Sequence, residues 1–498
     1  MKKLIKVLTA SFIFIANTHA SLLNDLPEIN YESFTLDNGL TVVVHEDRKV
    51  PMVAVNVWYH VGSKNEKVGK TGFAHLFEHL MFNGTENYNS EYFEPFEKIG
   101  STDQNGTTNS DRTNYFQNVP TNAVDLALWM ESDRMGHLLG VVDQEKLDEQ
   151  RGVVQNEKRQ GENQPYGKAF TRISEAAFPK GHPYSWTTIG SMEDLDAASL
   201  EDVQEWFKTY YGPNNAVLAL AGDIDLETAR EKVKKYFGDI PAGPPLIKPD
   251  VWIAKRSEEK RDIMYDNVPQ ARIYKAWNVP PRDTEAAAHF DLASSVLVGG
   301  KNSPLFKELV YEKQIATSVS AFYYDREIAG MFIVVVDVVS GQEPKIVEKE
   351  MDAVLQTFIQ KGPNKKLLEA EKTKTLASFI RGTQRIGGFG GKSDLLATCQ
   401  TYTGNPGCYI NNARYIDEST PAKIKSTFTK WIDDTPYVLT ILPSEKLATN
   451  ESTIDRSEGI PYPTEKISFK FPSLQTAKLS NGAKVVLAER KNIPLVEM

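Results

Sequence analysis

Two histidines and a glutamate stand close together in a chain that contains only eight histidines. In the segment GFAHLFEHLMFNG, His75 and His79 are four residues apart and Glu78 directly precedes the second histidine. Residues four apart lie on the same face of an α-helix, so a helix here would direct both imidazoles toward one point. Two imidazole nitrogens on one face suit a tetrahedral Zn²⁺ ion. We therefore predict that His75 and His79 bind a metal ion.

Glu78 is predicted to act in catalysis rather than as a metal ligand. It adjoins His79 too closely in sequence to share the same metal easily. Its carboxylate is better placed to accept a proton from water, as the general base of a metal-assisted hydrolysis. The alternative is a pair of surface histidines on an amphipathic helix, which fits less well because the flanking residues are apolar and bounded by glycine.

A catalytic zinc site also needs a third protein ligand and one open position. The best candidate is Glu157, in the helical segment DEQRGVVQNEKRQ. Val153 and Val154 mark the expected buried side of that helix, and Glu157 falls within it whereas Glu149 does not. A carboxylate on an apolar face is costly unless it is paired or bound to a metal. A buried salt bridge with an arginine is the alternative explanation for Glu157.

The elements that would position these residues follow from periodicity. Helical patterns cover three segments, residues 72–82, 122–139 and 143–160. Strand patterns cover three others, residues 33–46 with an Asp-Asn-Gly turn inside, 52–61 and 216–224. This mixture predicts an α+β fold.

Two polar, proline-containing stretches divide the chain, at residues 237–250 and 442–466. We expect two sequential domains of mixed sheet and helices. The expected segments are a metal-binding domain at 21–245, a second domain at 250–445, a linker at 446–470 and a short final segment at 471–498.

The final segment repeats the start of the first domain. LSNGAKVVLAERKNIPLVEM aligns without gaps with LDNGLTVVVHEDRKVPMVAV, so that Leu479 matches Leu36 and Val486 matches Val43. We interpret residues 471–498 as the start of a second copy of the first domain. Because this copy stops within a strand, we expect the chain to be a fragment of something longer.

The first twenty residues have the pattern of a secretory signal peptide. Lysines precede an apolar run at Val7–Ala16, and small residues stand at Thr18 and Ala20. The apolar run is too short to span about 30 Å of hydrocarbon. We expect cleavage after Ala20, no stable membrane insertion, and an exported protein in the periplasm or outside the cell.

The composition argues against nucleic-acid binding and permits a single disulfide bond. The net charge of −9 and the lack of a basic patch argue against nucleic-acid binding. The chain has two cysteines, Cys399 and Cys408, so no disulfide framework holds the fold. They flank a Thr-Gly-Asn-Pro turn, and we expect them to form a disulfide in an oxidising compartment.

His-x-x-Glu-His is an inverted zinc-binding motif. Together with the glutamate of NEKR, 78 residues after His79, it makes the chain resemble the pitrilysin/insulinase family of zinc metallopeptidases. The resemblance implies that His75, His79 and Glu157 bind one Zn²⁺ per chain and that Glu78 is the catalytic base. It also implies a fold like one half of the family's clam-shaped chamber.

The resemblance extends to a substrate-binding strand. The segment GSTDQNGTTNSDRTNYF resembles the family's edge strand, which binds an extended peptide by β-augmentation. It implies that Asn105, Gly106, Thr107 and Thr108 contact the substrate, with Asn105 bonding to its backbone.

Two positions depart from the family pattern. Gln150 stands seven residues before Glu157, where the family commonly has a glutamate that supports the site. Val310 and Thr317 stand where a second-type domain carries an arginine and a tyrosine that face the zinc. The chain is therefore expected to need a second peptidase-family half, either a C-terminal repeat or a separate subunit.

The glycine-rich segment RIGGFGGKSD lacks the Walker pattern and the strand that precedes a phosphate-binding loop. We expect a flexible loop near the chamber.

The expected function is zinc-dependent endopeptidase action on peptides or small unfolded polypeptides. One alternative is a non-catalytic, zinc-binding structural or partner subunit of the same family. Another is a metal-dependent hydrolase of small molecules, which the peptide-binding-like strand disfavours.

Overall fold

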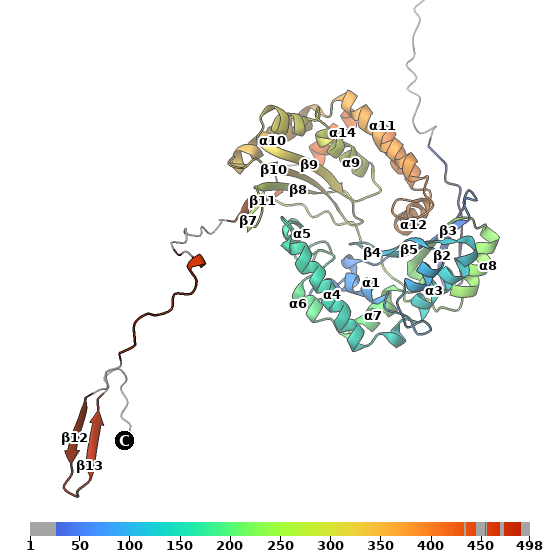
Figure 1. The fold of residues 1–498 in the computed structure, drawn as a ribbon. Helices are drawn as coiled ribbons and strands as arrows, with labels where there is room; N and C mark the ends of the chain where they lie inside the picture. The colour runs from blue at the N-terminus through green and yellow to red at the C-terminus, as the bar shows by residue number, and fades with distance from the viewer. Residues whose placement is uncertain (1–25, 433–434, 445–453, 455, 469–472, 490–498) are drawn as a thin grey trace, which may run out of the picture. The chain divides into compact units, whose positions relative to one another are not determined.

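A computed structural model describes residues 26–432, 435–444, 454, 456–468 and 473–489 of the chain (Figure 1). The chain divides into two units, Met1–Ser444 and Glu445–Met498. The expected signal peptide, residues 1–20, lies outside the described residues.

The first part of the larger unit is built on a six-stranded sheet with the order β1-β2-β6-β3-β5-β4. The strands are β1 (Glu32–Thr35), β2 (Thr41–Glu46), β3 (Met52–Tyr59), β4 (Thr102–Thr108), β5 (Thr113–Pro120) and β6 (Ala216–Gly222). β2 and β6 run parallel, and the other neighbours are antiparallel. β4 is therefore an edge strand.

Helices cover one face of this sheet. They are α1 (Phe73–Leu80), α2 (Glu94–Lys98), α3 (Val124–Gly136), α4 (Gln144–Asn163), α6 (Met192–Asp196), α7 (Leu200–Tyr210) and α8 (Leu226–Phe237). Alternate residues of β3, namely Val53, Val55 and Val57, are fully buried against them in one core cluster. The two-residue period of a strand places these side chains on one face.

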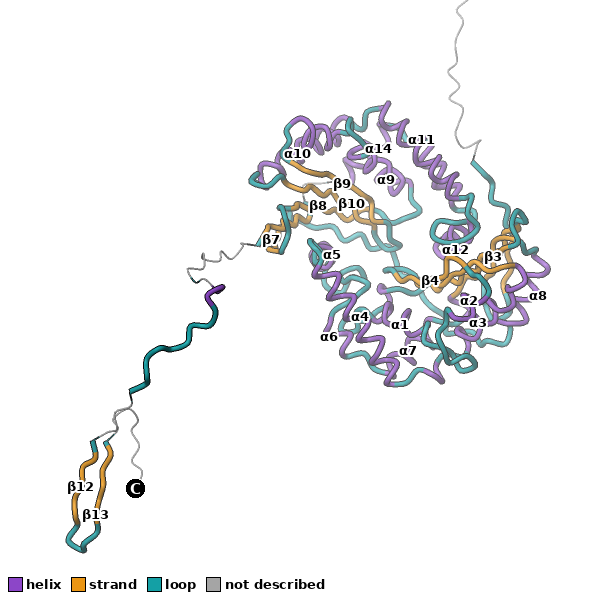
Figure 2. The backbone as a smooth tube through the Cα atoms, in the orientation of Figure 1, coloured by secondary structure: helices purple, strands orange, loops and turns teal. Residues whose placement is uncertain are grey.

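A second sheet has the order β7-β11-β8-β10-β9 (Figure 2). Its strands are β7 (Lys260–Asp266), β8 (Arg272–Val279), β9 (Ala316–Tyr324), β10 (Gly330–Val338) and β11 (Tyr437–Pro443). The helices of this part are α9 (Glu285–Val298), a π-helical turn (Phe306–Glu312), α10 (Pro344–Lys361), α11 (Lys365–Gly382), α13 (Tyr409–Asp417) and α14 (Pro421–Trp431). Side chains of α9, α10, α11 and α14 form the core with one face of this sheet. The predicted α+β class, with two sheet-and-helix layers, is confirmed.

Each sheet receives a helix from the other part of the chain. α5 (Ala169–Ala177) packs its Ile173 against Tyr274 and Ile333 of the second sheet. α12 (Lys392–Thr403) packs Leu396 and its neighbours against the free face of the first sheet. The first sheet lies within residues 32–222 and the second within residues 260–443, and the exchange of α5 and α12 joins them in one compact unit. The domain bounds 21–245 and 250–445 stay a prediction.

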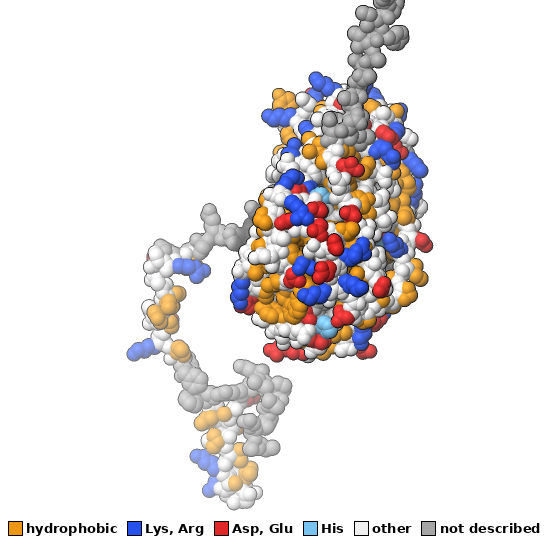
Figure 3. Space-filling view, turned by 90° about the vertical axis from the view of Figure 1, so that its right-hand side faces the viewer, with side chains coloured by type: hydrophobic (Ala, Val, Ile, Leu, Met, Phe, Trp, Pro, Cys, Tyr) orange, Lys and Arg blue, Asp and Glu red, His pale blue; other side chains and the backbone are white. Residues whose placement is uncertain are grey.

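The face of the larger unit drawn in Figure 3 carries mixed charge. Figure 3 shows acidic and basic side chains interspersed over one face of the larger unit, with no extended area of a single sign. A nucleic-acid-binding surface would need a basic stripe or patch, and the face drawn has none.

The smaller unit contains a hairpin that reproduces β1 and β2. Its strands are β12 (Leu474–Lys478) and β13 (Lys484–Ala488). Gln475 pairs with Leu487 just as Glu32 pairs with Val44, which is the same register in the aligned numbering. The glycine of each Asn-Gly turn has a φ of +89°. We propose, as the sequence suggests, that residues 471–498 begin a second copy of the first domain.

Cys399 and Cys408 are joined by a disulfide bond, with their Cα atoms 5.3 Å apart. Both are buried beneath the first sheet. A disulfide that closes a loop this short increases the free energy of unfolding by roughly 2–3 kcal/mol. We therefore expect replacement of both cysteines by alanine to lower the free energy of unfolding by about that amount, measured in urea. Reductant should destabilise the wild type and leave the double variant unchanged. Free thiols in the native protein under oxidising conditions, detected by labelling, would contradict the bond.

Candidate metal centre

The metal-binding motif lies on α1, whose apolar side is fixed against the sheet. Leu76, Phe77 and Leu80 are fully buried. The helix begins after Gly72, which has a φ of +84°, and a Cβ there would lie 2.6 Å from the carbonyl oxygen of Ile189. Only glycine adopts this conformation without strain and leaves room for that contact. The opposite face of α1, which carries His75 and His79, is thereby held away from the core and is partly exposed.

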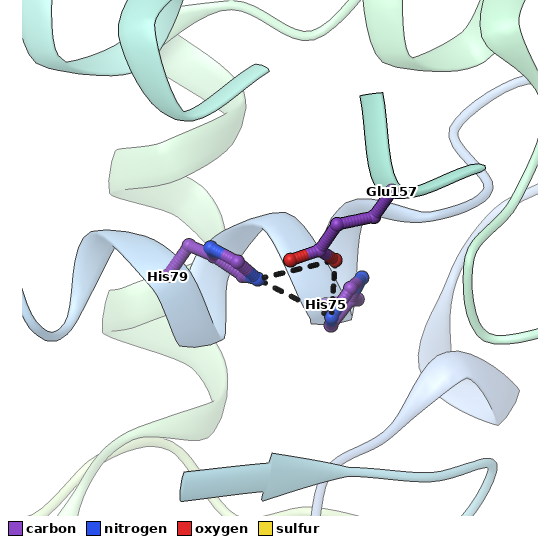
Figure 4. A group of neighbouring side chains, drawn as sticks. All are labelled: His75, His79 and Glu157. Carbon is purple, nitrogen blue, oxygen red and sulfur yellow. Dashed lines mark hydrogen bonds and ion pairs between the residues drawn. The ribbon is translucent and has the colours of Figure 1, made fainter. Parts of the chain in front are cut away.

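The side chains of His75, His79 and Glu157 meet at this face of α1 (Figure 4). The Nε2 atoms of His75 and His79 are 3.3 Å apart, and each lies 3.7 Å from Oε2 of Glu157. Tetrahedral ligands at ~2.0–2.1 Å from a zinc ion are about 3.4 Å from one another. Among the described residues, these three form the one group of histidine, cysteine or carboxylate ligands close enough to hold a metal ion. The donor set therefore fits zinc.

The ionisation state of His75 suits metal binding. Burial, and the neighbouring His79, lower the pKa of His75 to about 4, so its imidazole is neutral near pH 7. A neutral imidazole offers the lone pair that a metal needs. Its Nδ1 is buried and has no hydrogen-bond partner among the described side chains and backbone.

Glu78 lies on the same helix and is buried. Burial raises its pKa to about 7, although a hydrogen bond from Thr108 and the charge of Arg112 act in the opposite direction. Thr108 is the last residue of β4, so the Glu78 side chain contacts the end of the edge strand. A carboxyl group that titrates near neutral pH can both accept and release a proton.

Glu157 does not lie on the buried face of α4, so the predicted burial of this residue was wrong. The side chain of Glu157 is 44% exposed, and Val153 is 38% exposed. The buried face of α4 instead runs through Leu147, Val154 and Lys158. Among the described residues, Glu157 has no arginine partner, and its ion pairs are with the two histidines. The Glu157 carboxylate lies beside the two histidines and stays partly exposed to solvent, so its position costs little desolvation energy.

Gln150 lies about two helical turns before Glu157 on α4. Its Oε1 is 3.3 Å from Nδ1 of His79, the ring nitrogen that faces away from Glu157. In this geometry the imidazole N–H donates to the amide oxygen. An outer partner of this kind fixes the tautomer and the ring orientation of a histidine ligand.

We expect Gln150→Ala to weaken zinc binding by about 10–100-fold, because His79 would lose the group that orients it. Gln150→Glu should bind zinc at least as tightly as the wild type, since a carboxylate accepts the same bond and raises the basicity of the ring. Competition with a chelator of known affinity measures both variants. Equal affinities for Gln150→Ala and the wild type would show that the contact has no effect on the metal.

The four residues predicted to contact substrate lie together on β4, beside the metal centre. β4 pairs with β5 on one side only, so its other edge is free among the described residues. The backbone N–H of Gly106 donates to Oδ1 of Asn105 (2.9 Å), and the Thr107 hydroxyl donates to Asn114 (2.6 Å). Thr108 adjoins Glu78.

Two supporting residues escaped the sequence analysis. Glu66 is buried and accepts a hydrogen bond from the backbone N–H of Ala74 (2.8 Å), at the start of α1. Burial raises its pKa to about 8. Arg112 donates to the carbonyl oxygen of Thr107 (2.8 Å) and so holds β4. Neither residue has a local signal, because charged residues in loops usually face solvent.

Two models of one peptidase family match the chain. The model described as Insulinase (Peptidase family M16) matches residues 41–189, and the one described as Peptidase M16 inactive domain matches residues 197–375. Together they span about two thirds of the chain. Over these residues the chain is similar to the insulinase family of peptidases. The first match contains His75, Glu78, His79 and Glu157.

Relatives of this chain carry related names. The zinc protease PqqE of Helicobacter pylori is 28% identical over 382 residues, which cover 75% of this chain and 85% of that protein. The probable mitochondrial-processing peptidase subunit beta of Schizosaccharomyces pombe is 25% identical over 318 residues, 61% of this chain and 69% of that protein. The crystal structure of a protease from Helicobacter pylori superposes with a TM-score of 0.76 at 26% identity, covering 84% of this chain and all of that one. At the family level, these matches support a peptidase or a partner of one.

Proposed function

We propose that this chain is a zinc-dependent endopeptidase that cleaves peptides or small unfolded polypeptides. The observation that carries the proposal is the combination of three convergent ligand side chains with a buried carboxylate, Glu78, beside them. His75, His79 and Glu157 would hold one zinc ion. Bound there, zinc would act as a Lewis acid that polarises the scissile carbonyl and promotes ionisation of the attacking water.

Glu78 is the proposed proton carrier. Its carboxylate accepts the proton of the attacking water and then delivers it to the nitrogen of the departing amine. Both transfers need a group whose pKa is near the working pH, and burial raises the pKa of Glu78 toward that range. No other carboxylate among the described residues lies on α1.

The free edge of β4 is the proposed peptide-binding element. An extended peptide would add to this edge through backbone hydrogen bonds, which are independent of its sequence. Asn105 and Gly106 lie along the edge, and the strand ends at Thr108 beside Glu78. A peptide paired with β4 would therefore pass in front of the metal centre.

A non-catalytic partner subunit is the second candidate, because residues 197–375 match a model described as an inactive domain. That match does not include the metal centre, which falls in residues 41–189. We therefore favour catalysis. Mass spectrometry of peptide mixtures incubated with the protein and a second insulinase-family half that has no metal site of its own tests the choice. The proposal expects internal peptide-bond cleavage that a zinc chelator abolishes, and a partner subunit would give no cleavage in any condition.

We also propose that full activity requires a second insulinase-family half. The arginine and tyrosine expected to face the zinc are replaced here by Val310 and Thr317. The Thr317 hydroxyl accepts from Gln270 (2.7 Å) and donates to the carbonyl oxygen of Asp337 (3.4 Å), so it is already engaged within the second sheet. The fission-yeast relative, named as a subunit of a peptidase, is in keeping with a paired arrangement.

We expect residues 21–498 alone to bind zinc and to cleave peptides slowly or not at all. Loss of one donor to a developing oxyanion typically costs about 10²–10³ in rate. A second half, supplied as a separate polypeptide that carries the arginine and the tyrosine, should restore at least that factor. Steady-state cleavage of a quenched peptide measures it. Full turnover by the purified monomer, abolished by Glu78→Gln, would mean that one half suffices.

Export to the periplasm or beyond the cell remains a proposal that rests on the first twenty residues of the sequence. Within the described ranges, no helix combines the length and the apolar character that a membrane crossing requires.

A further inference from the structure

The glycine-rich segment Arg385–Gly391, between α11 and α12, has no part in the metal centre. We propose that it forms a subsite for a large apolar side chain of the bound peptide, with Phe389 as the contacting residue. This inference rests on the proposed function, because it takes the free edge of β4 as the peptide-binding element.

The segment packs closely against the first sheet. A Cβ at Gly387 would lie 2.0 Å from Oδ1 of Asn118 on β5 and 2.7 Å from Cβ of Ala54 on β3. A Cβ at Gly388 would lie 3.4 Å from Oδ2 of Asp103 at the start of β4. Glycine thus permits close approach of this backbone to the sheet. The sequence suggested a flexible loop, whereas the structure shows a backbone fitted against the substrate strand and its neighbours.

Hydrogen bonds hold the segment in this position. The backbone N–H groups of Lys392 and Ser393 donate to the carbonyl oxygens of Arg385 and Ile386, each at 2.9 Å. The N–H of Gly390 donates to a carboxylate oxygen of Asp394 on α12, also at 2.9 Å. α12 itself is packed on the first sheet (Figure 1). The tip of the loop is therefore fixed relative to β4.

Phe389 is the large apolar side chain at this tip. Its ring lies 5.0 Å from the ring of Phe116, in an edge-to-face arrangement. Phe116 is 5% exposed, whereas Phe389 is 48% exposed. The chain therefore leaves about half of an aromatic ring uncovered beside the edge of the sheet.

The register of the sheet relates this ring to a bound peptide. Phe116 is directly opposite Asn105 in the β4–β5 ladder, so both side chains lie on the face that carries the loop. In a peptide strand added to β4, the residue opposite Asn105 would place its side chain on the same face. Asn105 precedes Thr108 by three residues, about 10 Å of extended strand. The subsite therefore lies roughly three residues from the scissile bond, and it favours leucine, phenylalanine or methionine.

Peptide binding to the zinc-loaded full chain tests the subsite directly. The chain carries Glu78→Gln to prevent turnover, and the probes are fluorescent ten-residue peptides in which one leucine is moved through an alanine background. We expect leucine to improve affinity about tenfold at one position, as burial of one apolar side chain would. In the same background, Phe389→Ala should reduce the ratio of the affinities for the leucine and alanine peptides to about one. Phe389→Leu should give an intermediate ratio.

Tyr311→Ala is the matched control, because Tyr311 is an exposed aromatic residue elsewhere in the second part of the chain. It should leave the leucine preference unchanged. A preference that survives Phe389→Ala, or the lack of a preferred position, would overturn the subsite, and so would failure of all the peptides to bind. Binding that behaves as expected, together with a wild-type protein that cleaves nothing beside a second half, would refute the catalytic proposal and leave the subsite standing.

Discussion

Replacing Glu78 with glutamine is expected to leave zinc bound and to reduce peptide hydrolysis by about 10²–10⁴-fold, the range for loss of a general base. Glutamine has nearly the shape of glutamate, so it fills the same buried position on α1. It cannot accept a proton from water at neutral pH. Zinc content and steady-state rate, measured on the same preparation in the presence of a second half, separate the two effects.

Glu149→Gln is the control for this substitution. Glu149 is an exposed carboxylate on α4, and its replacement should change neither zinc content nor rate. Loss of zinc from Glu78→Gln would place Glu78 among the ligands. An unchanged rate would assign the proton transfer to another group.

The second large effect concerns the ligands. Zinc binding should be weakened in each of the variants His75→Ala, His79→Ala and Glu157→Ala, because each variant lacks one of the three ligand atoms. The loss should exceed the roughly 10–100-fold expected for a residue that only supports a ligand. Activity should be lost with the metal. Zinc content after dialysis, and competition with a chelator, measure the loss. Since Glu157 is 44% exposed, its removal should leave the unfolding transition of the metal-free protein nearly unchanged.

Glu149→Ala serves as the control here as well, since it removes a carboxylate from the same helix. It should retain a full equivalent of zinc. Full zinc occupancy in Glu157→Ala would exclude Glu157 from the site, and Glu149 would then be the first candidate for the third ligand.

The convergence of His75 and His79 could be predicted because its determinants are local. His75 and His79 are one helical turn apart, and the apolar residues between them fix which side of α1 faces the sheet. The burial of α4 could not be predicted in the same way. Val153 looks like a core residue in the sequence, yet it is 38% exposed, and the buried face of α4 runs through Leu147, Val154 and Lys158. Which face of a helix is covered depends on the elements that pack against it, and these are distant in sequence.

Longer-range features had no local signal. The exchange of α5 and α12 between the two sheets depends on how distant segments pack, and so does the cap that Glu66 provides for α1. The glycines of residues 387–391 were interpreted as a sign of flexibility. In the fold, Gly387 is needed because the backbone passes too close to Asn118 for a side chain, a requirement that is set by residues far away in sequence.

We propose that zinc held by His75, His79 and Glu157 makes this chain a peptidase. Titration of zinc into the metal-free protein, with a second half present and an extended quenched peptide as substrate, tests it most directly. We expect cleavage to rise in proportion to zinc up to one equivalent per chain and then to level off. Cleavage that persists in the metal-free protein, or no cleavage at one bound equivalent, would contradict it.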